Sequence, residues 1–206
     1  MAGFRAGFDH YPRIAMKIDR VFVCLLLLGG LLSLLVPARA AEPRDPYQYF
    51  FEQSLGDMNE ELEVAREEGK KGVFVFFELD ECPFCHRMKR TVLNQPEVQE
   101  FYRKHFHNLA VDIEGDIEVT DFHGKETTLK GFASEYRVRA TPVLAFFDLD
   151  GNLLVRYTGA TSGVEEFMWL ADYYLQGVYK MKDKNGRPIR FSRYKRMRKK
   201  EKASRS

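Results

Sequence analysis

Short apolar runs bounded by turn residues recur along residues 41–180 and predict the strands of this chain. The run at residues 73–77 is apolar at every position, which is typical of a strand buried on both faces in the middle of a sheet. Asp150-Gly151 joins the last two runs by a tight turn, which indicates an antiparallel pair. The predicted strands lie at residues 73–77, 109–113, 141–147 and 153–157.

Between these runs, apolar residues recur at helical spacing. One continuous helix is predicted over residues 47–68. A second helix is expected to begin at Pro83 and to be interrupted near Pro96, because proline removes a helical hydrogen bond. The same spacing predicts a short helix at residues 131–138 and a closing amphipathic helix at residues 164–175.

The order of these elements predicts an α/β fold with a central mixed sheet of about four strands flanked by helices. A strand–helix–strand unit requires parallel strands and a right-handed crossover, whereas the final pair is antiparallel. Turn residues and alternation at residues 114–130 predict a small hairpin-like insertion. The expected domain spans residues 41–180, and residues 181–206 read as a basic, disordered tail.

The first forty residues have the composition of a secretory signal peptide. Basic residues precede an apolar run of 16 residues at positions 21–36, and Ala38-Arg39-Ala40 resembles a cleavage site. A membrane span needs about 20 apolar residues. We therefore expect export to the periplasm with cleavage after Ala40, and the alternative is an anchor in the inner membrane formed by residues 21–36.

Cleavage would leave only two of the three cysteines, because Cys24 lies inside the apolar run. A disulfide between Cys82 and Cys85 closes a tiny loop and stabilises a fold little, so the value of the pair is chemical. Disulfide exchange proceeds by thiolate attack through a mixed disulfide that a second thiol resolves. At a helix N-terminus, Cys82 is favoured as the attacking thiolate, with Cys85 as the resolving thiol.

Two other functions fit the same residues. Cys82-Pro83-Phe84-Cys85-His86 also spells the attachment motif of c-type haem, although a motif that follows a buried strand in an α/β frame favours redox work. Two thiolates with His86 fall short of the four ligands of a structural zinc site. We therefore expect no metal and no cofactor, and keep a haem- or metal-binding protein as the alternative.

The charge of the chain is divided unevenly. Residues 41–179 contain 14 Lys/Arg and 26 Asp/Glu, a balance of −12, whereas residues 180–206 contain 13 and 2, a balance of +11. A basic segment can contact anionic lipid, and a weak membrane contact through the tail is one expectation. An alternative is that the tail folds across the acidic domain. Nucleic acid is not expected as a partner.

These residues resemble the thioredoxin superfamily and, more narrowly, periplasmic thioredoxin-related proteins of the SoxW type. The resemblance covers roughly residues 48–180, and the pairing of Cys-x-x-Cys with a Thr-Pro about sixty residues later is its specific part. The similar segments are residues 77–88, 96–98, 106, 111–115, 122–125, 136–142, 146–148, 150–151, 159, 166–167 and 173–179.

The resemblance implies that Thr141-Pro142 is a cis peptide bond facing Cys82, where both residues position the substrate. Pro83 and Phe84, between the cysteines, are expected to contact the substrate too. It further implies a thiol–disulfide oxidoreductase, more often a reductant, that acts on periplasmic protein thiols and disulfides. Such a protein receives electrons from a membrane donor. The second hypothesis is a thioredoxin-fold binding module without turnover.

The sequence departs from a typical thioredoxin behind and beside the cysteines. Phe76 stands where thioredoxins bury an aspartate that shuttles a proton for the resolving thiol. Glu78 is a candidate substitute, although a solvated acid is the expected state. Glu81 and His86 flank the motif and would act on the thiolate with opposite sign, so the sequence leaves the direction of electron flow open.

Overall fold

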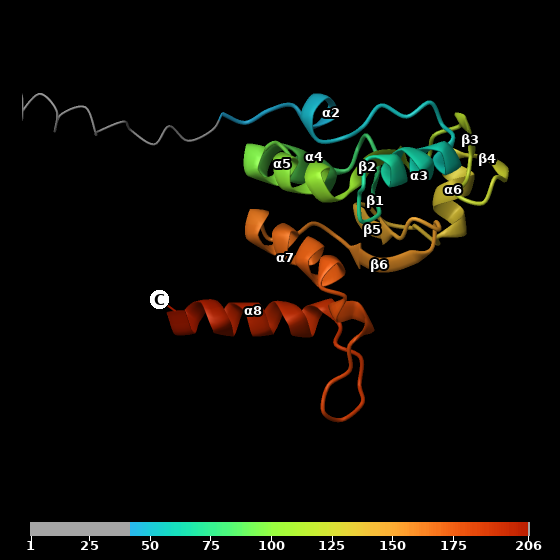
Figure 1. Cartoon of the computed structure of the whole chain (residues 1–206). Helices are drawn as coiled ribbons and strands as arrows, with labels where there is room; N and C mark the ends of the chain where they lie inside the picture. Colours follow the sequence, from blue (N-terminus) through green and yellow to red (C-terminus); the bar gives the residue numbers. More distant parts are fainter. Residues whose placement is uncertain (1–41, 206) are drawn as a thin grey trace, which may run out of the picture. The chain divides into compact units, whose positions relative to one another are not determined.

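A four-stranded sheet in the order β2-β1-β5-β6 forms the centre of the computed structural model, which describes residues 42–205 (Figure 1). β1 pairs with β2 in parallel and with β5 antiparallel, and β5 pairs antiparallel with β6. The predicted mixed sheet is thus confirmed. Its strands are β1 (Val73–Glu78), β2 (His107–Asp112), β5 (Val143–Phe147) and β6 (Leu153–Thr158).

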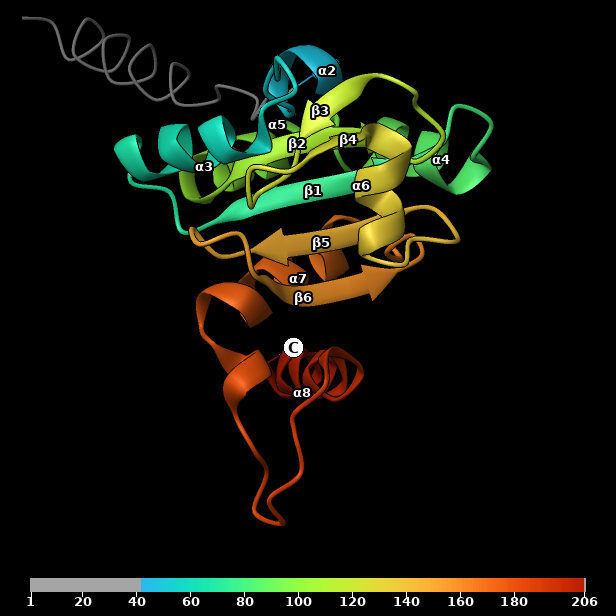
Figure 2. The same ribbon diagram turned by 90° about the vertical axis from the view of Figure 1, so that its right-hand side faces the viewer.

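Helices cover both faces of the sheet, because β1 is buried at every position and sends alternate side chains to opposite sides. Phe74 and Phe76 pack in one hydrophobic cluster, and Val73, Val75 and Phe77 pack in another. Figure 2 shows α3 and α6 in front of the sheet and α7 behind it. The first cluster is covered by α4 (Pro83–Thr91), α5 (Pro96–His105) and α7 (Val164–Leu175), the second by α3 (Met58–Glu67) and α6 (Leu129–Glu135).

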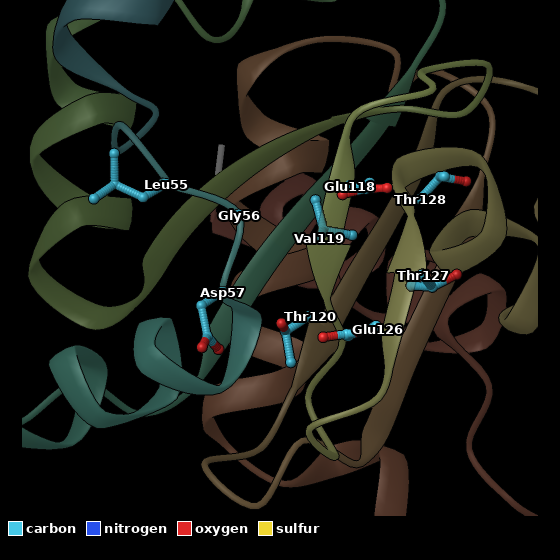
Figure 3. A pocket seen from close by; sticks show the side chains of 9 residues that line it. All are labelled: Leu55, Gly56, Asp57, Glu118, Val119, Thr120, Glu126, Thr127 and Thr128. Carbon is cyan, nitrogen blue, oxygen red and sulfur yellow. The ribbon is translucent and has the colours of Figure 1, made fainter.

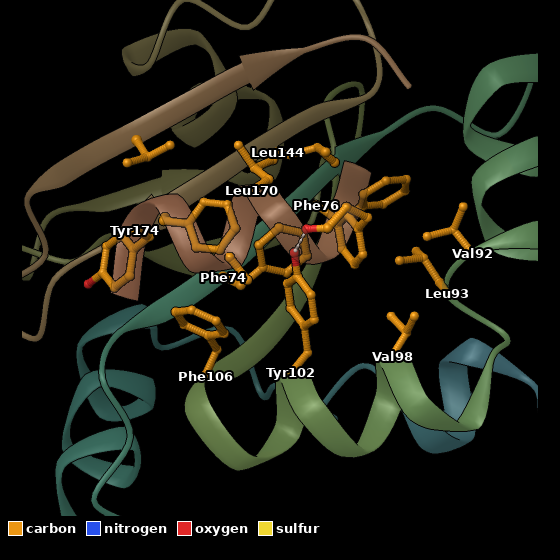
Figure 4. Packing of buried hydrophobic residues seen from close by; sticks show 14 of the residues in the cluster. Phe74, Phe76, Val92, Leu93, Val98, Tyr102, Phe106, Leu144, Leu170 and Tyr174 are labelled. Atoms are coloured by element: carbon orange, nitrogen blue, oxygen red, sulfur yellow. Dashed lines mark hydrogen bonds between the residues drawn. The ribbon is translucent and has the colours of Figure 1, made fainter. Parts of the chain in front are cut away.

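Aromatic rings fill the first cluster (Figure 4). The rings of Tyr102 and Phe167 stack with centroids 4.2 Å apart, which joins α5 to α7. The Tyr102 hydroxyl donates a hydrogen bond to the Phe167 carbonyl at 2.9 Å. Complete burial raises the pKa of Tyr102 well above its ordinary value, so this hydroxyl stays a neutral donor.

The continuous helix predicted over residues 47–68 is wrong. The structure has a short α2 (Pro46–Tyr49), an extended segment, and then α3. Leu55, which would lie on the apolar face of such a helix, is 97 % exposed. Gly56 takes a positive φ of 97°, and the Asp57 side chain accepts hydrogen bonds from the backbone N–H groups of Asn59 and Glu60, which starts α3 there.

Two other predicted features are confirmed. The hairpin-like insertion consists of β3 (Glu118–Thr120) and β4 (Glu126–Thr128), paired antiparallel. The interruption near Pro96 is also present, because α4 ends at Thr91 and α5 begins at Pro96.

The tail differs from the expected disorder over residues 181–206. A short 3-10 helix, η1 (Val178–Lys180), leads into a turn and then into α8 (Phe191–Arg205). Phe191 and Tyr194 of α8 are buried, and both rings contact the Tyr173 ring of α7. The block of like charges predicted that residues 181–206 would be solvated and disordered. The tail is instead folded because Phe191 and Tyr194 pack on α7 and because acidic residues of the domain pair with its cations.

Ion pairs hold α8 along α7. Lys195 Nζ lies 2.7 Å from Glu166 Oε1, and Lys202 Nζ lies 2.8 Å from Glu165 Oε1. Glu166 is 4 % exposed. Burial by itself would raise its pKa, but hydrogen bonds from Lys195 and from the Ser162 hydroxyl outweigh burial and lower it. The buried carboxylate is thus ionised at neutral pH.

Residues 1–40, predicted as a signal peptide, and the apolar run within them lie outside the described residues. Within residues 42–205, no helix is long and apolar enough to cross a membrane.

Replacing Phe191 with alanine tests whether α8 is part of the folded domain. Loss of a buried ring from the contact with Tyr173 is expected to lower the free energy of unfolding by about 3 kcal/mol, measured by urea denaturation. Met197→Ala, at an exposed position of the same helix, is the control and is expected to change it by less than about 0.5 kcal/mol. Equal stability of both variants and the parent would contradict a packed α8.

Acidic pH should weaken the attachment of α8. Because the pKa of folded Glu166 lies below its ordinary value of 4.5, its stabilising contribution is fully present above that ordinary value and is lost as the pH falls through the lower pKa of the folded state. Glu166→Gln is expected to lower the free energy of unfolding at pH 7 by about 2 kcal/mol and to flatten its dependence on pH between about 5 and 3. A pH profile unchanged from that of the parent would contradict the assignment.

Candidate functional site

The cysteine motif forms the first turn of α4, directly after the central strand. β1 ends at Glu78, and a turn closed by the hydrogen bond from Cys82 N–H to the Leu79 carbonyl at 3.2 Å leads to Cys82. Cys82 is the N-cap of α4, and Pro83 is its first residue, where a missing N–H costs nothing. The motif thus lies where free N–H groups favour negative charge, as predicted.

Cys82 and Cys85 are joined as a disulfide, with their Cα atoms 5.2 Å apart. Cys82 is 7 % exposed and Cys85 is fully buried. The backbone N–H of Cys85 donates a hydrogen bond to Cys82 Sγ at 3.1 Å. After reduction, this N–H and the helix dipole would stabilise a thiolate at Cys82. The difference in exposure agrees with attack by Cys82 and resolution by Cys85.

Thr141-Pro142 reaches the same edge of the sheet as Cys82. Its peptide bond is cis, as the resemblance implied. Val143 pairs with Phe77 in the antiparallel register of β5 and β1, so Pro142 lies beside the end of β1. Gly159 N–H donates to the Pro142 carbonyl at 2.8 Å, which fixes this turn against the end of β6. Pairing of the strands therefore gathers the cysteine turn, the cis-proline turn and the loop after β6 at one edge.

Pro83 and Phe84 form the exposed part of the motif. The Phe84 side chain is 57 % exposed, with the Arg87 guanidinium 5.6 Å from its ring centre. A large exposed ring beside a redox cysteine is a surface on which a substrate can pack. Both residues stand where a substrate contact was predicted.

Glu78 is buried, so the expectation of a solvated acid is wrong. It is 6 % exposed, and Lys89 Nζ lies 2.6 Å from its Oε2 atom. The hydroxyl of Tyr47 donates to its Oε1 atom at 2.7 Å, and Lys89 also donates to that hydroxyl at 2.7 Å. Three side chains from α2, β1 and α4 form one closed network.

Charge and burial tune this network. Burial by itself would lower the pKa of Lys89, but its hydrogen bonds to Glu78 and Tyr47 and the charge of Glu78 outweigh burial and raise it. Burial and the neighbouring Glu78 raise the pKa of Tyr47, against an opposing bond from Lys89. Lys89 is therefore a cation and Tyr47 a neutral phenol at neutral pH.

Lys89 and Tyr47 were missed in the sequence. Lys89 follows Cys85 by four residues and so lies one helical turn behind it on α4. That spacing was the available signal for Lys89. Tyr47 had none, because only the folded chain brings α2 to the end of β1.

Glu81 and His86 are less closely involved. Glu81 is exposed in the turn before Cys82. His86 Nε2 donates to the Asp80 carbonyl at 2.5 Å, a bond that ties the first turn of α4 to the preceding turn. Phe76 is fully buried in the aromatic cluster, so no acid occupies the place of the thioredoxin aspartate.

A hollow of about 640 Å³ between residues 55–57 and the β3–β4 hairpin contains none of these residues (Figure 3). Its walls carry Asp57, Glu118, Thr120 and Glu126. Among residues 42–205, no group of three or more His, Cys, Asp or Glu side chains is placed to hold a metal ion.

Comparison with known proteins defines the class. The thioredoxin-like domain family matches residues 58–175, more than half of the chain. The chain belongs to this family. No curated protein sequence gives a significant match.

The chain is also similar to solved structures, one of which reaches a TM-score of 0.50 and supports the fold. A thioredoxin-fold protein from Helicobacter pylori is 22% identical, with a TM-score of 0.50, over 61% of this chain and 83% of that one. A DsbH oxidoreductase is 21% identical, with a TM-score of 0.49, over 68% and 92%. A thioredoxin from Thermus thermophilus is 26% identical, with a TM-score of 0.45, over 61% and 91%. The chain is thus a thioredoxin-fold protein with a Cys-x-x-Cys pair at disulfide distance, and the SoxW type stays a prediction.

Replacing Glu78 with glutamine should destabilise the domain by leaving the Lys89 ammonium without its charged partner. We expect the free energy of unfolding to fall by about 3 kcal/mol in urea denaturation. Glu81→Gln removes a carboxylate from the adjacent exposed turn and should change it by less than about 0.5 kcal/mol. If Glu78→Gln were as mild as Glu81→Gln, the buried network would not be a structural unit.

Proposed function

We propose that this chain is an exported thiol–disulfide oxidoreductase that acts on protein partners in the periplasm. The observation that carries the proposal is the Cys82–Cys85 pair at the start of α4 beside a cis Thr141-Pro142 turn. A disulfide alone would suit a structural role, but its tiny loop gives little stability. The exposed Phe84 and the cis-proline turn supply a surface for a partner.

In the reducing direction, the Cys82 thiolate attacks one sulfur of a partner disulfide. The partner S–S bond breaks, a mixed disulfide forms, and one partner thiolate leaves. Cys85 then attacks Cys82 Sγ and releases the second partner thiol. The partner gains two electrons and two protons, and the protein is left with its own disulfide, which a dithiol donor must reduce again.

The network of Glu78, Lys89 and Tyr47 is the candidate proton store for this cycle. Glu78 is a buried carboxylate whose partner Lys89 lies one helical turn after the resolving cysteine, and a group of this kind could exchange a proton with Cys85. Glu78 lies two residues after Phe76, which occupies the position of the thioredoxin aspartate. Its carboxylate accepts a hydrogen bond from Lys89 of α4.

The finer parts of the proposal rest on the resemblance to SoxW-type proteins. They are the role of reductant, a membrane dithiol donor, and partners with oxidised thiols in sulfur metabolism or cytochrome maturation. Export rests on the signal-peptide pattern of residues 1–40. Cleavage after Ala40 gives a periplasmic protein, and retention of residues 21–36 would leave it anchored in the inner membrane.

Insulin reduction with dithiothreitol as electron donor tests the proposal. Cys82→Ser should lower the rate by about a hundredfold or more, because it removes the attacking sulfur. Cys85→Ser should accumulate a mixed disulfide that mass spectrometry detects. Equal rates for the parent and Cys82→Ser would favour the binding module without turnover. A redox titration then tests direction: a potential near −270 mV, about that of thioredoxin, supports a reductant, and one near −120 mV contradicts it.

A further inference from the structure

The edge of the sheet that carries the cysteines also carries the start of α7. Val143 pairs with Phe77 on one side and with Thr158 on the other, so β1 and β6 end together. Adjacent strands lie about 4.8 Å apart, which puts these two ends about 10 Å apart. Both are followed by a loop and a helix that packs on the same face of the sheet, α4 after β1 and α7 after β6.

α8 runs antiparallel along α7, and its second half lies beside the start of α7 (Figure 1). Near the end of α7, Tyr173 contacts Phe191 and Tyr194 in the first turns of α8. In the first turn of α7, Glu165 pairs with Lys202 in the last turns of α8. The C-terminal half of α8 is therefore a neighbour of the loop that joins β6 to α7.

Six of the eight cations of α8 fall into two groups, and the other two, Arg193 and Arg205, pair with Asp183 and Glu201. Lys195, Arg198 and Lys202 turn inward and pair with Glu166, Asp172 and Glu165.

The outward group consists of Arg196, Lys199 and Lys200, which are exposed and have no acidic partner within residues 42–205. Pairing of the inward cations neutralises the acids of α7. The outward cations therefore give this end of an otherwise acidic domain a net positive surface.

A hollow of about 580 Å³ separates the two helices at this end. Val164, Trp169 and Ala203 give it apolar walls, and Lys199 and Lys202 line it together with Glu165 and Glu166. Lys202 is paired with Glu165, so a peptide segment would place apolar groups inside the hollow and a carboxylate at Lys199.

We propose that the C-terminal half of α8, with Arg196, Lys199 and Lys200, is a docking surface for an acidic segment of the disulfide-bearing protein substrate. This inference rests on the proposed function, because it names the class of substrate for the same cysteines. Charge complementarity would raise the rate of encounter with such substrates. Asp80 and Glu81 are exposed beside Cys82, so the preferred acids lie some residues away from the substrate cysteine.

A protein segment fits this surface better than a lipid bilayer does. The outward cations lie on the helix that forms one wall of a concave hollow beside the start of α7, and a flat bilayer surface would leave the hollow empty. Met197 is the only large apolar side chain exposed on α8, whereas interfacial helices insert a broad apolar face.

Disulfide-linked model peptides of equal length test the proposal. Each has its cysteine in neutral sequence and carries four glutamates, four lysines or four serines about five residues away. The measured quantity is kcat/KM for reduction by the full chain at low salt. For the parent, we expect the glutamate peptide to exceed the serine peptide by about tenfold, with a smaller ratio in 0.5 M salt, where charges are screened beyond about 4 Å.

The triple variant Arg196→Glu, Lys199→Glu, Lys200→Glu should abolish that tenfold preference. The matched control Lys71→Glu, Lys104→Glu, Lys184→Glu makes the same change in net charge. Its positions are exposed and lie toward the opposite edge of the sheet, before β1, at the end of α5 and after η1. The control should keep the preference.

Four outcomes would overturn the proposal. In the first, the parent shows no preference for the glutamate peptide. In the second, both triple variants lose the preference equally. In the third, the parent shows no preference but self-associates, and the α8 variant does not self-associate. Binding of the parent, but not of the α8 variant, to phosphatidylglycerol vesicles without a peptide preference would assign the surface to a membrane. No turnover of even the serine peptide would instead contradict the proposed function itself.

Discussion

Burial of β1 on both faces is the constraint on which the rest of the structure depends. All six of its residues are buried, so helices must cover each face, and β2 and β5 must occupy both hydrogen-bonding edges. Helices on both faces and paired strands on both edges fix the position of the C-terminal end of β1. That end carries Cys82 and, through the pairing of Val143 with Phe77, the cis-proline turn. The redox site is thus a consequence of the packing of the central strand.

The sequence was sufficient where local pattern and tertiary contact agree. The apolar run at residues 73–77, the Asp150-Gly151 turn and the proline at position 96 each specify their element by local chemistry. The position of the cysteine motif was predictable for the same reason, because the apolar run before it and Pro83 within it are enough to predict that a helix begins there after a buried strand. For the same reason, the cysteine pair and the order of the strands along the chain were predictable.

The sequence was insufficient where an element depends on a distant partner. Glu78 looked like a solvated acid at a strand end, and only Lys89 and Tyr47, 11 and 31 residues away, make it a buried one. Residues 47–68 have helical spacing, yet Phe50 and Phe51 are buried in a non-helical turn. Charge counting predicted a disordered tail, because it could not see that Glu166 and Tyr173 form a surface for α8.

The two groups of charged residues differ in how far solvent screens them from the cysteines. The network of Glu78, Lys89 and Tyr47 has a buried carboxylate and an exposed phenol, and it joins β1 to α4, the two elements that flank the cysteine turn. Its charges are only partly solvated, which strengthens their interactions. α8 places its unpaired cations at the surface, where solvent and salt screen them from Cys82. Such cations have little effect on a thiolate in the interior and a larger one on the approach of a charged partner. If α8 binds the substrate as we propose, the domain separates control of the thiol from recognition of the substrate.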